Sequence, residues 1–170
     1  YFNPIIIPDS TNQIKKYNIV LIIMESFSRE YTSIFNKNIP DYQGYTPFLD
    51  SLIKESFAFE YSFANGIRSV DCMPGVLAGI PRYKEPYCYY FYANNTLQGL
   101  PEMLKNEGYY CAFFHGAPNT SLGFKGFANA VGYQDYYGMT EYNNDADFDG
   151  TWAIWDEPFF DYFAENTDKI

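Results

Sequence analysis

Apolar runs and amphipathic stretches alternate along this chain, and the alternation predicts its secondary structure. Residues 18–25, Asn-Ile-Val-Leu-Ile-Ile-Met-Glu, form a nearly uninterrupted apolar run, which predicts a strand buried on both faces. Residues 57–63 alternate aromatic and polar side chains and predict a second, shorter strand. Residues 109–114 predict a third strand that ends at His115. We expect the three strands to belong to one sheet, with Glu25 and His115 at the same edge.

Helix signals separate the predicted strands. The stretch from Thr46 to Glu55 combines a cap, a proline in the first turn and apolar residues at helical spacing. A second helix is expected to start at Ser69 and to run to Gly79, despite Pro74. This alternation of strands and helices predicts an α/β fold. The remaining expected segments are a linker at 1–17, an aromatic loop at 81–95, and helices at 97–107, 124–131 and 157–165.

Length and composition narrow the class of protein. A chain of 170 residues can hold one domain with a sizeable core. A net charge of -10 argues against a nucleic-acid partner, because binding phosphates requires basic patches. The three cysteines, Cys72, Cys88 and Cys111, lack metal-binding spacing, and their odd count leaves at least one free thiol. The chain shows neither a signal peptide nor a membrane-spanning run, and we expect it to be part of a longer protein.

Four residues are placed where chemistry could occur. Glu25, at the end of the first predicted strand, and His115, at the end of the third, occupy positions where α/β sheets bind ligands. Ser69 opens a predicted helix, where a serine most often serves as an N-cap, but where an anion is also stabilised by backbone N–H groups. Arg68 could pair with the same anion, or could simply be solvated. A divalent metal shared by Glu25 and Ser69 would activate the hydroxyl as a nucleophile.

Five sequence motifs occur in order along the chain. They are Asn18-Ile-Val-Leu-Ile-Ile-Met-Glu25-Ser, Thr46-Pro-Phe-Leu-Asp-Ser-Leu, Asn65-Gly-Ile-Arg-Ser69, Leu77-Ala-Gly-Ile-Pro81 and Phe114-His115-Gly116. Together they resemble the lipoteichoic acid synthase-like sulfatase family, the phosphoglycerol transferases of the alkaline phosphatase superfamily. The resemblance covers roughly residues 17 to 165. It implies an N-terminal portion, residues 18–170, of a sulfatase/alkaline-phosphatase-like domain in which helices flank the sheet.

The resemblance also implies roles for individual residues. Glu25 corresponds to a metal ligand, Ser69 to the nucleophile that also contacts the metal, and His115 to a residue lining the substrate site. The implied cofactor is one divalent cation, Mn²⁺ in the first place, with Mg²⁺, Zn²⁺ or Ca²⁺ as alternatives. The implied reaction is transfer of a phosphodiester head group through a covalent intermediate on Ser69, resolved by a hydroxyl acceptor or by water.

Two departures from the family pattern bear on the substrate. The family completes its metal site with an Asp-His pair farther along the chain, and no such pair follows here, so we expect the chain alone to be inactive. Synthases that polymerise glycerol phosphate carry a Trp and an Arg shortly after the Phe-His-Gly motif, whereas this chain has neither at residues 122–125. The sequence therefore indicates metal-assisted chemistry, but it does not indicate that a phosphoglycerol polymer is the substrate.

Three alternatives to phosphoglycerol transfer stay open. Phosphoethanolamine transferases share the fold, the hydroxyl nucleophile and the metal. A sulfatase-type hydrolase would need a Cys/Ser-x-Pro-x-Arg context, but the stretch from Cys72 to Val76 ends on valine instead of arginine. A non-catalytic glycan-binding module would use the Tyr-rich loop at 83–92.

An acidic segment near the end of the chain has the spacing of a calcium-binding loop. Asp145, Asp147, Asp149 and Asp156 match that spacing, and a helix is expected to follow, but no clear helix precedes the segment. The simpler interpretation is an acidic surface turn in which Asp156 caps the helix at 157–165.

The family resemblance finally implies a location. It suggests an enzyme anchored in the bacterial cytoplasmic membrane, with this domain on the periplasmic or extracellular side and residues 1–17 leading from upstream membrane helices. The partners would then be phospholipid or glycan substrates and the membrane itself. The acidic charge does not oppose this location, because an anchored domain needs no basic patch to stay near lipid.

Overall fold

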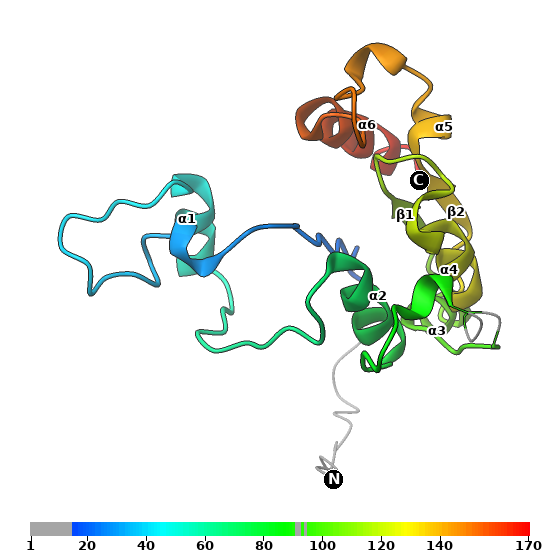
Figure 1. Ribbon diagram of the computed structural model, residues 1–170, viewed down its shortest axis with the longest axis horizontal. Coiled ribbons are helices and arrows are strands. Elements are labelled where there is room, and N and C mark those ends of the chain that lie inside the picture. Colours follow the sequence, from blue (N-terminus) through cyan, green and yellow to red (C-terminus); the bar gives the residue numbers. More distant parts are fainter. Residues whose placement is uncertain (1–14, 91–92, 94) are drawn as a thin grey trace, which may run out of the picture. The chain divides into compact units, whose positions relative to one another are not determined.

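The computed structural model describes residues 15–90, 93 and 95–170 (Figure 1). The chain divides into two compact units, Tyr1–Leu52 and Ile53–Ile170, and each is described by itself. Most of the linker predicted at 1–17 lies outside the described residues.

The first unit is organised around a buried carboxylate. A 3-10 turn, η1 (Arg29–Tyr31), precedes the helix α1 (Pro47–Lys54), whose last two residues are assigned to the second unit. Asp50 of α1 is buried and accepts hydrogen bonds from the backbone N–H of Ser33 and of Ile34, each at 3.0 Å. The helix predicted from Thr46 to Glu55 is thereby confirmed, and Asp50 ties it to the loop before it.

The strand predicted at 18–25 is wrong for this structure. Residues 15–24 form neither strand nor helix, and the apolar side chains at 19–24 are between 41% and 62% exposed. A strand exists only where a neighbouring backbone supplies hydrogen bonds, and the described residues offer no such neighbour here. Glu25 consequently lies in a turn, next to Ser26, which has a φ of 54°.

The strand predicted at 57–63 is also wrong. The segment contains no strand, and its aromatic side chains are exposed, up to 95% at Phe63. Alternation of aromatic and polar residues produces a strand only when a sheet face covers the aromatic side, and no described element covers it.

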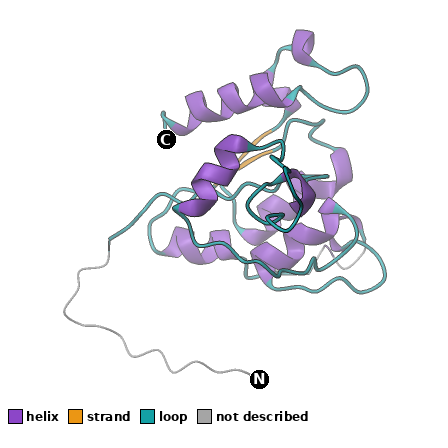
Figure 2. Ribbon diagram, turned by 90° about the vertical axis from the view of Figure 1, so that its left-hand side faces the viewer, coloured by secondary structure: helices purple, strands orange, loops and turns teal. Residues whose placement is uncertain are grey.

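Two short parallel strands form the sheet of the second unit. β1 (Ala112–Phe114) pairs with β2 (Asp135–Tyr137), with Phe113 opposite Tyr136, and Figure 2 shows helices around them. Backbone bonds extend the pairing at both ends, from Gln134 N to Cys111 O at 2.9 Å and from His115 N to Tyr137 O at 3.0 Å. The third predicted strand is therefore confirmed in shortened form, whereas β2 was not predicted from the sequence.

Helices pack around one hydrophobic core in this unit. α2 (Ser69–Ala78) contacts both α3 (Leu100–Asn106) and α4 (Phe124–Val131), and η2 (Tyr87–Tyr89) lies against α2. These helices confirm the predictions at 69–79, 97–107 and 124–131, although α3 begins three residues late. The buried residues of the core are Val70, Met73, Leu77, Cys88, Phe124, Phe127, Ala128, Val131 and Tyr136.

A buried thiol compensates for the proline inside α2. Pro74 has no backbone N–H, so the carbonyl of Val70 loses its helical donor. The Cys88 thiol lies 3.9 Å from that carbonyl oxygen and donates to it. Burial, together with the nearby Asp71 charge, raises the pKa of Cys88 to about 12. Cys88 is therefore a structural thiol and stays protonated at neutral pH.

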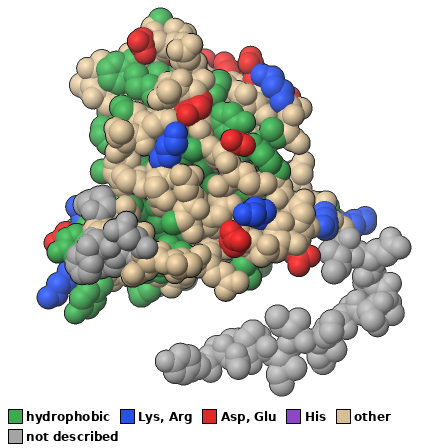
Figure 3. All heavy atoms as spheres, turned by 90° about the vertical axis from the view of Figure 1, so that its right-hand side faces the viewer, with side chains coloured by type: hydrophobic (Ala, Val, Ile, Leu, Met, Phe, Trp, Pro, Cys, Tyr) green, Lys and Arg blue, Asp and Glu red, His purple; other side chains and the backbone are tan. Residues whose placement is uncertain are grey.

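The last part of the second unit is rich in aromatic contacts. After η4 (Ser121–Gly123) and β2 come α5 (Met139–Tyr142), η5 (Asp145–Asp147) and α6 (Asp156–Thr167). α6 confirms the helix predicted at 157–165, and Tyr162 and Phe163 on it contact the Phe114 ring of β1 edge-on. The face drawn in Figure 3 shows apolar side chains at the surface between scattered charged ones. In the described part of the chain, no helix combines the length and apolar character required to cross a membrane.

Candidate functional site

Ser69 is the first residue of α2, and its hydroxyl is not used to hold the helix together. The N-cap is Arg68, whose backbone is extended, with φ -133° and ψ 151°. Ser69 is half-buried, and its Oγ makes no hydrogen bond within the described residues. The capping role that a serine would ordinarily take here is therefore absent, which leaves the hydroxyl available for chemistry at a helix N-terminus.

A buried carboxylate ties together the segments on either side of α2. The Asp71 side chain is fully buried, and its Oδ2 lies 3.1 Å from Nε of Arg82 and 3.8 Å from Nε of Arg68. Gly66 packs directly against it, because an added Cβ would come within 2.3 Å of the Asp71 Cβ. Asp71 therefore connects the loop that leads into Ser69 with the loop that leaves α2.

The same carboxylate lines a cavity of about 260 Å³ beside α2. Neither oxygen of Asp71 has a hydrogen-bond partner of good geometry in the described structure, so the charge is compensated by the ion pair with Arg82 and the longer one with Arg68. Arg68 was a candidate from the sequence, whereas Asp71 and Arg82 were not. The sequence signal for Asp71 was a carboxylate two residues after Ser69, on the apolar side of the predicted helix, where a charge needs a partner. The cavity is lined by Asp71, Pro74, Ile80, Pro81, Arg82, Tyr83, Glu85 and Tyr87.

His115 follows β1 directly and is held on three sides. Its backbone N–H donates to Tyr137 O at 3.0 Å, and its Nδ1 lies 3.2 Å from the Tyr136 hydroxyl oxygen. The Phe124 ring meets the imidazole edge-on at 4.7 Å between centroids. Burial lowers the pKa of His115 to about 4, so the imidazole is neutral at physiological pH.

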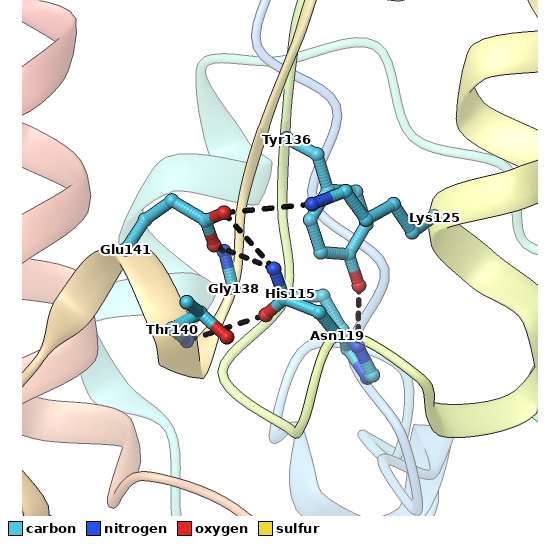
Figure 4. Close-up of polar contacts among 7 residues, drawn as sticks. All are labelled: His115, Asn119, Lys125, Tyr136, Gly138, Thr140 and Glu141. Carbon is cyan, nitrogen blue, oxygen red and sulfur yellow. Dashed lines mark hydrogen bonds and ion pairs between the residues drawn. The ribbon is translucent and has the colours of Figure 1, made fainter.

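A polar network surrounds the His115–Tyr136 pair (Figure 4). Glu141 accepts hydrogen bonds from the Asn119 amide and, at 2.8 Å, from Gly138 N–H, while Lys125 Nζ lies 3.6 Å from its Oε1. Burial alone would raise the pKa of Glu141, but the hydrogen bonds from Asn119 and Gly138 outweigh it and lower the pKa. Glu141 therefore stays charged and joins α4, α5 and the loop after His115.

The depressed pKa of His115 predicts a pH-dependent stability. Between pH 6.5, the ordinary pKa, and about 4, the unfolded chain binds a proton that the folded chain does not. The free energy of unfolding should therefore fall as the pH drops through this window and should be insensitive to His115 above it. Urea denaturation of wild type and His115→Gln across pH 4 to 7 isolates this contribution, because carboxylates titrate alike in both. Parallel pH profiles would contradict the assignment.

Ser69 and His115 flank the same hydrophobic core. Val70 follows Ser69 in α2, and Phe124 and Tyr136 contact His115; all three belong to one buried cluster. The second unit thus brings an uncommitted hydroxyl and a neutral imidazole to the margins of one core.

Glu25 lies in the first unit, so its approach to Ser69 or to His115 stays a prediction. It is exposed, and its carboxylate makes no hydrogen bond or ion pair within the described residues, which leaves both oxygens for a cation. Carboxylate and hydroxyl oxygens suit Mn²⁺ and Mg²⁺, so the donor chemistry fits. Over the described residues, however, no group of three or more His, Cys, Asp or Glu side chains could hold a metal. Glu25 and Ser69 would supply only part of a ligand set.

The acidic segment does not bring its four aspartates together as a calcium loop requires. Asp149 Oδ1 instead accepts hydrogen bonds from the N–H groups of Thr151 and Trp152, at 2.7 and 2.6 Å. Asp147 Oδ2 accepts one from the Tyr142 hydroxyl at 2.5 Å. Asp145 starts η5, and Asp156 is the first residue of α6 and not its cap. The segment is therefore a turn that Asp149 closes.

Comparison with known proteins places the chain in a family. Residues 17–169 match the family described as sulfatase, so the chain belongs to the sulfatase family. This match agrees with an α/β fold of the sulfatase/alkaline-phosphatase type.

Two solved structures resemble the fold. One is a protein in the alkaline phosphatase superfamily from Vibrio parahaemolyticus, with a TM-score of 0.69, 22% identity, and coverage of 82% of this chain and 33% of that chain. The other is the lipoteichoic acid synthase LtaP from Listeria monocytogenes, with a TM-score of 0.68, 21% identity, and coverage of 75% and 31%. The chain thus spans about a third of the length of each structure, and at these identities the likeness concerns the fold.

Proposed function

We propose that the complete protein is a metal-dependent phosphotransferase or phosphodiesterase that uses Ser69 as its nucleophile. The observation that carries this proposal is the half-buried Ser69 hydroxyl, which begins α2 and caps nothing. Membership of the sulfatase family supports hydrolase or transferase chemistry. The motif resemblance, together with the fold shared with a lipoteichoic acid synthase, supports phosphoglycerol or a related head group as the donor.

The chain's own residues suggest how the reaction would proceed. Ser69 Oγ would attack the phosphorus of a phosphodiester lipid and form the new P–O bond, so that the head group with its phosphoryl group stays on Ser69. The bond that breaks is the one to diacylglycerol, whose alkoxide takes up the proton that Ser69 loses. Backbone N–H groups at the start of α2, with the adjacent Arg68, would hold the anionic oxygens. A hydroxyl acceptor or water would then release the phosphoryl group from Ser69. A divalent metal on Glu25 and Ser69 would lower the pKa of the attacking hydroxyl.

The proposed site of action is the outer face of a bacterial cytoplasmic membrane. Lipid head groups of this kind are accessible there, and this chain would be one part of an enzyme anchored by segments upstream of it. Recovery of the complete protein in the soluble cytoplasmic fraction would contradict both the anchor and the lipid substrate.

A lipid assay tests the proposed activity. The complete protein is incubated with vesicles containing either phosphatidylglycerol or phosphatidylethanolamine, with Mn²⁺ or with EDTA, and diacylglycerol is measured. We expect diacylglycerol from phosphatidylglycerol with Mn²⁺ and a loss of turnover with EDTA, because the metal activates the nucleophile.

Other substrates in the same assay distinguish the alternative activities from phosphoglycerol transfer. Turnover confined to phosphatidylethanolamine would indicate a phosphoethanolamine transferase. Cleavage of 4-nitrophenyl sulfate without phospholipid turnover would indicate a sulfatase-type hydrolase. Either result would overturn phosphoglycerol transfer.

A further inference from the structure

Tyr136 is held in one orientation beneath the candidate site. The side chain belongs to β2 and is 6% exposed. Its ring stacks on Phe113 at 5.3 Å with an interplanar angle of 13°, and Lys125 Nζ lies 5.7 Å from the ring centroid. With the ring fixed in this way, the hydroxyl points at one group, His115 Nδ1, at 3.2 Å.

This contact selects one tautomer of His115. Within the described residues, Nδ1 is the one acceptor that the Tyr136 O–H meets. A proton on Nδ1 would turn that nitrogen into a donor and leave the buried O–H without an acceptor, which is unfavourable. With Nδ1 unprotonated, the O–H donates to it and both groups are satisfied. The ring proton then resides on Nε2.

Nε2 is the ring nitrogen of His115 that does not contact Tyr136. It makes no hydrogen bond in the described structure, and it is not among the buried side-chain atoms that lack a partner. Its proton can therefore be donated to a ligand. The charged groups nearby, Lys125 and Glu141, pair with each other at 3.6 Å and do not occupy Nε2.

We propose that Tyr136 is a positioning residue that holds His115 in the Nε2–H tautomer, so that His115 presents a neutral hydrogen-bond donor to an oxygen of the bound phosphodiester. The part of this proposal that concerns substrate rests on the proposed function, whereas the tautomer does not. The low pKa of His115, which burial causes, agrees with a neutral donor. His115 would thus stabilise charge on a phosphoryl oxygen and would not act as a general base.

The tautomer is tested by ¹⁵N NMR of the 170-residue chain, in which His115 is the one histidine. The wild type should show a protonated Nε2 and an unprotonated Nδ1. Tyr136→Phe keeps the ring stacking and removes the hydroxyl, so part of the proton population should shift to Nδ1. Tyr110→Phe removes another tyrosine hydroxyl, one that bonds Asp135, and should leave the imidazole signals unchanged. A wild-type spectrum with protonated Nδ1, or an unchanged spectrum in Tyr136→Phe, would overturn the proposal even if the enzyme is active.

Kinetics of the complete enzyme test the link to substrate. Tyr136→Phe should lower kcat about 10-fold on phosphatidylglycerol vesicles while KM changes little, because the donor acts on charge that develops during reaction. Tyr110→Phe should retain wild-type kinetics. A shifted tautomer with unchanged kcat would overturn the role of His115 toward substrate. Absence of turnover in the wild type would instead count against the proposed function, and the NMR result would still decide the tautomer.

Discussion

Replacing Ser69 with alanine should lower the turnover of the complete enzyme by about 10³-fold or more, because the covalent route through the nucleophile is removed. Stability should change little, by less than about 0.5 kcal/mol, since Ser69 Oγ makes no hydrogen bond within the described residues. The two effects are measured by diacylglycerol release and by urea denaturation. Large loss of activity without loss of stability is the signature of a residue used for chemistry.

Ser51→Ala is a matched control for this variant. Ser51 lies on α1, is exposed, and donates a hydrogen bond to Phe48 O at 2.7 Å. This substitution also removes one serine hydroxyl, but activity should stay at the wild-type level. Retained turnover in Ser69→Ala would remove Ser69 from the mechanism.

Replacing Arg82 with methionine should destabilise the protein by about 3 kcal/mol, the order expected when one partner of a buried ion pair is removed. Asp71 has a fully buried side chain, and Arg82, 26% exposed, lies nearest to it at 3.1 Å. Among the described residues, the charge left behind would keep an ion pair only with Arg68, at 3.8 Å. The free energy of unfolding, measured by urea denaturation, tests this expectation.

Two further variants give this prediction its controls. Lys105→Met removes one partner of the exposed pair Lys105–Glu102 and should cost less than about 1 kcal/mol. Adding Asp71→Leu to Arg82→Met removes the uncompensated charge and should recover part of the lost stability. Equal effects of Arg82→Met and Lys105→Met would show that Asp71 does not depend on Arg82.

The helices were predictable because their signals are local. Pro47 in the first turn locates the start of α1, and the left-handed glycines Gly79 and Gly132 end α2 and α4 where the sequence indicated. Such residues act on the backbone within a few positions, so a single sequence contains the necessary information. α5 was missed because four residues carry too little periodicity.

Strands were predicted less well because their partners are distant in sequence. The apolar run at 18–25 has the composition of a buried strand. Composition, however, does not show whether another strand lies beside it to form the backbone hydrogen bonds. β2 is three residues long and pairs with β1, from which α4 separates it in the sequence. The residue types of Asp135-Tyr-Tyr137 do not indicate that pairing.

The residues of the candidate site were likewise predictable only in part. Ser69 and His115 could be named because each adjoins an element with a local signal. Tyr136 could not be named, since its role depends on the register that sets β2 beside β1 and brings its hydroxyl to His115. Asp71 and Arg82 could not be paired from the sequence, because their contact depends on the path of the chain after α2 ends.

In the proposed mechanism, Ser69 carries the phosphoryl group during turnover. The most direct measurement is acid quenching of the complete enzyme during reaction with phosphatidylglycerol vesicles, followed by mass spectrometry of the peptide that contains Ser69. We expect a phosphoryl-linked adduct on Ser69 that disappears in Ser69→Ala and decays when excess acceptor is added. Rapid turnover with Ser69 unmodified at every quench time, or an adduct on another residue, would contradict it.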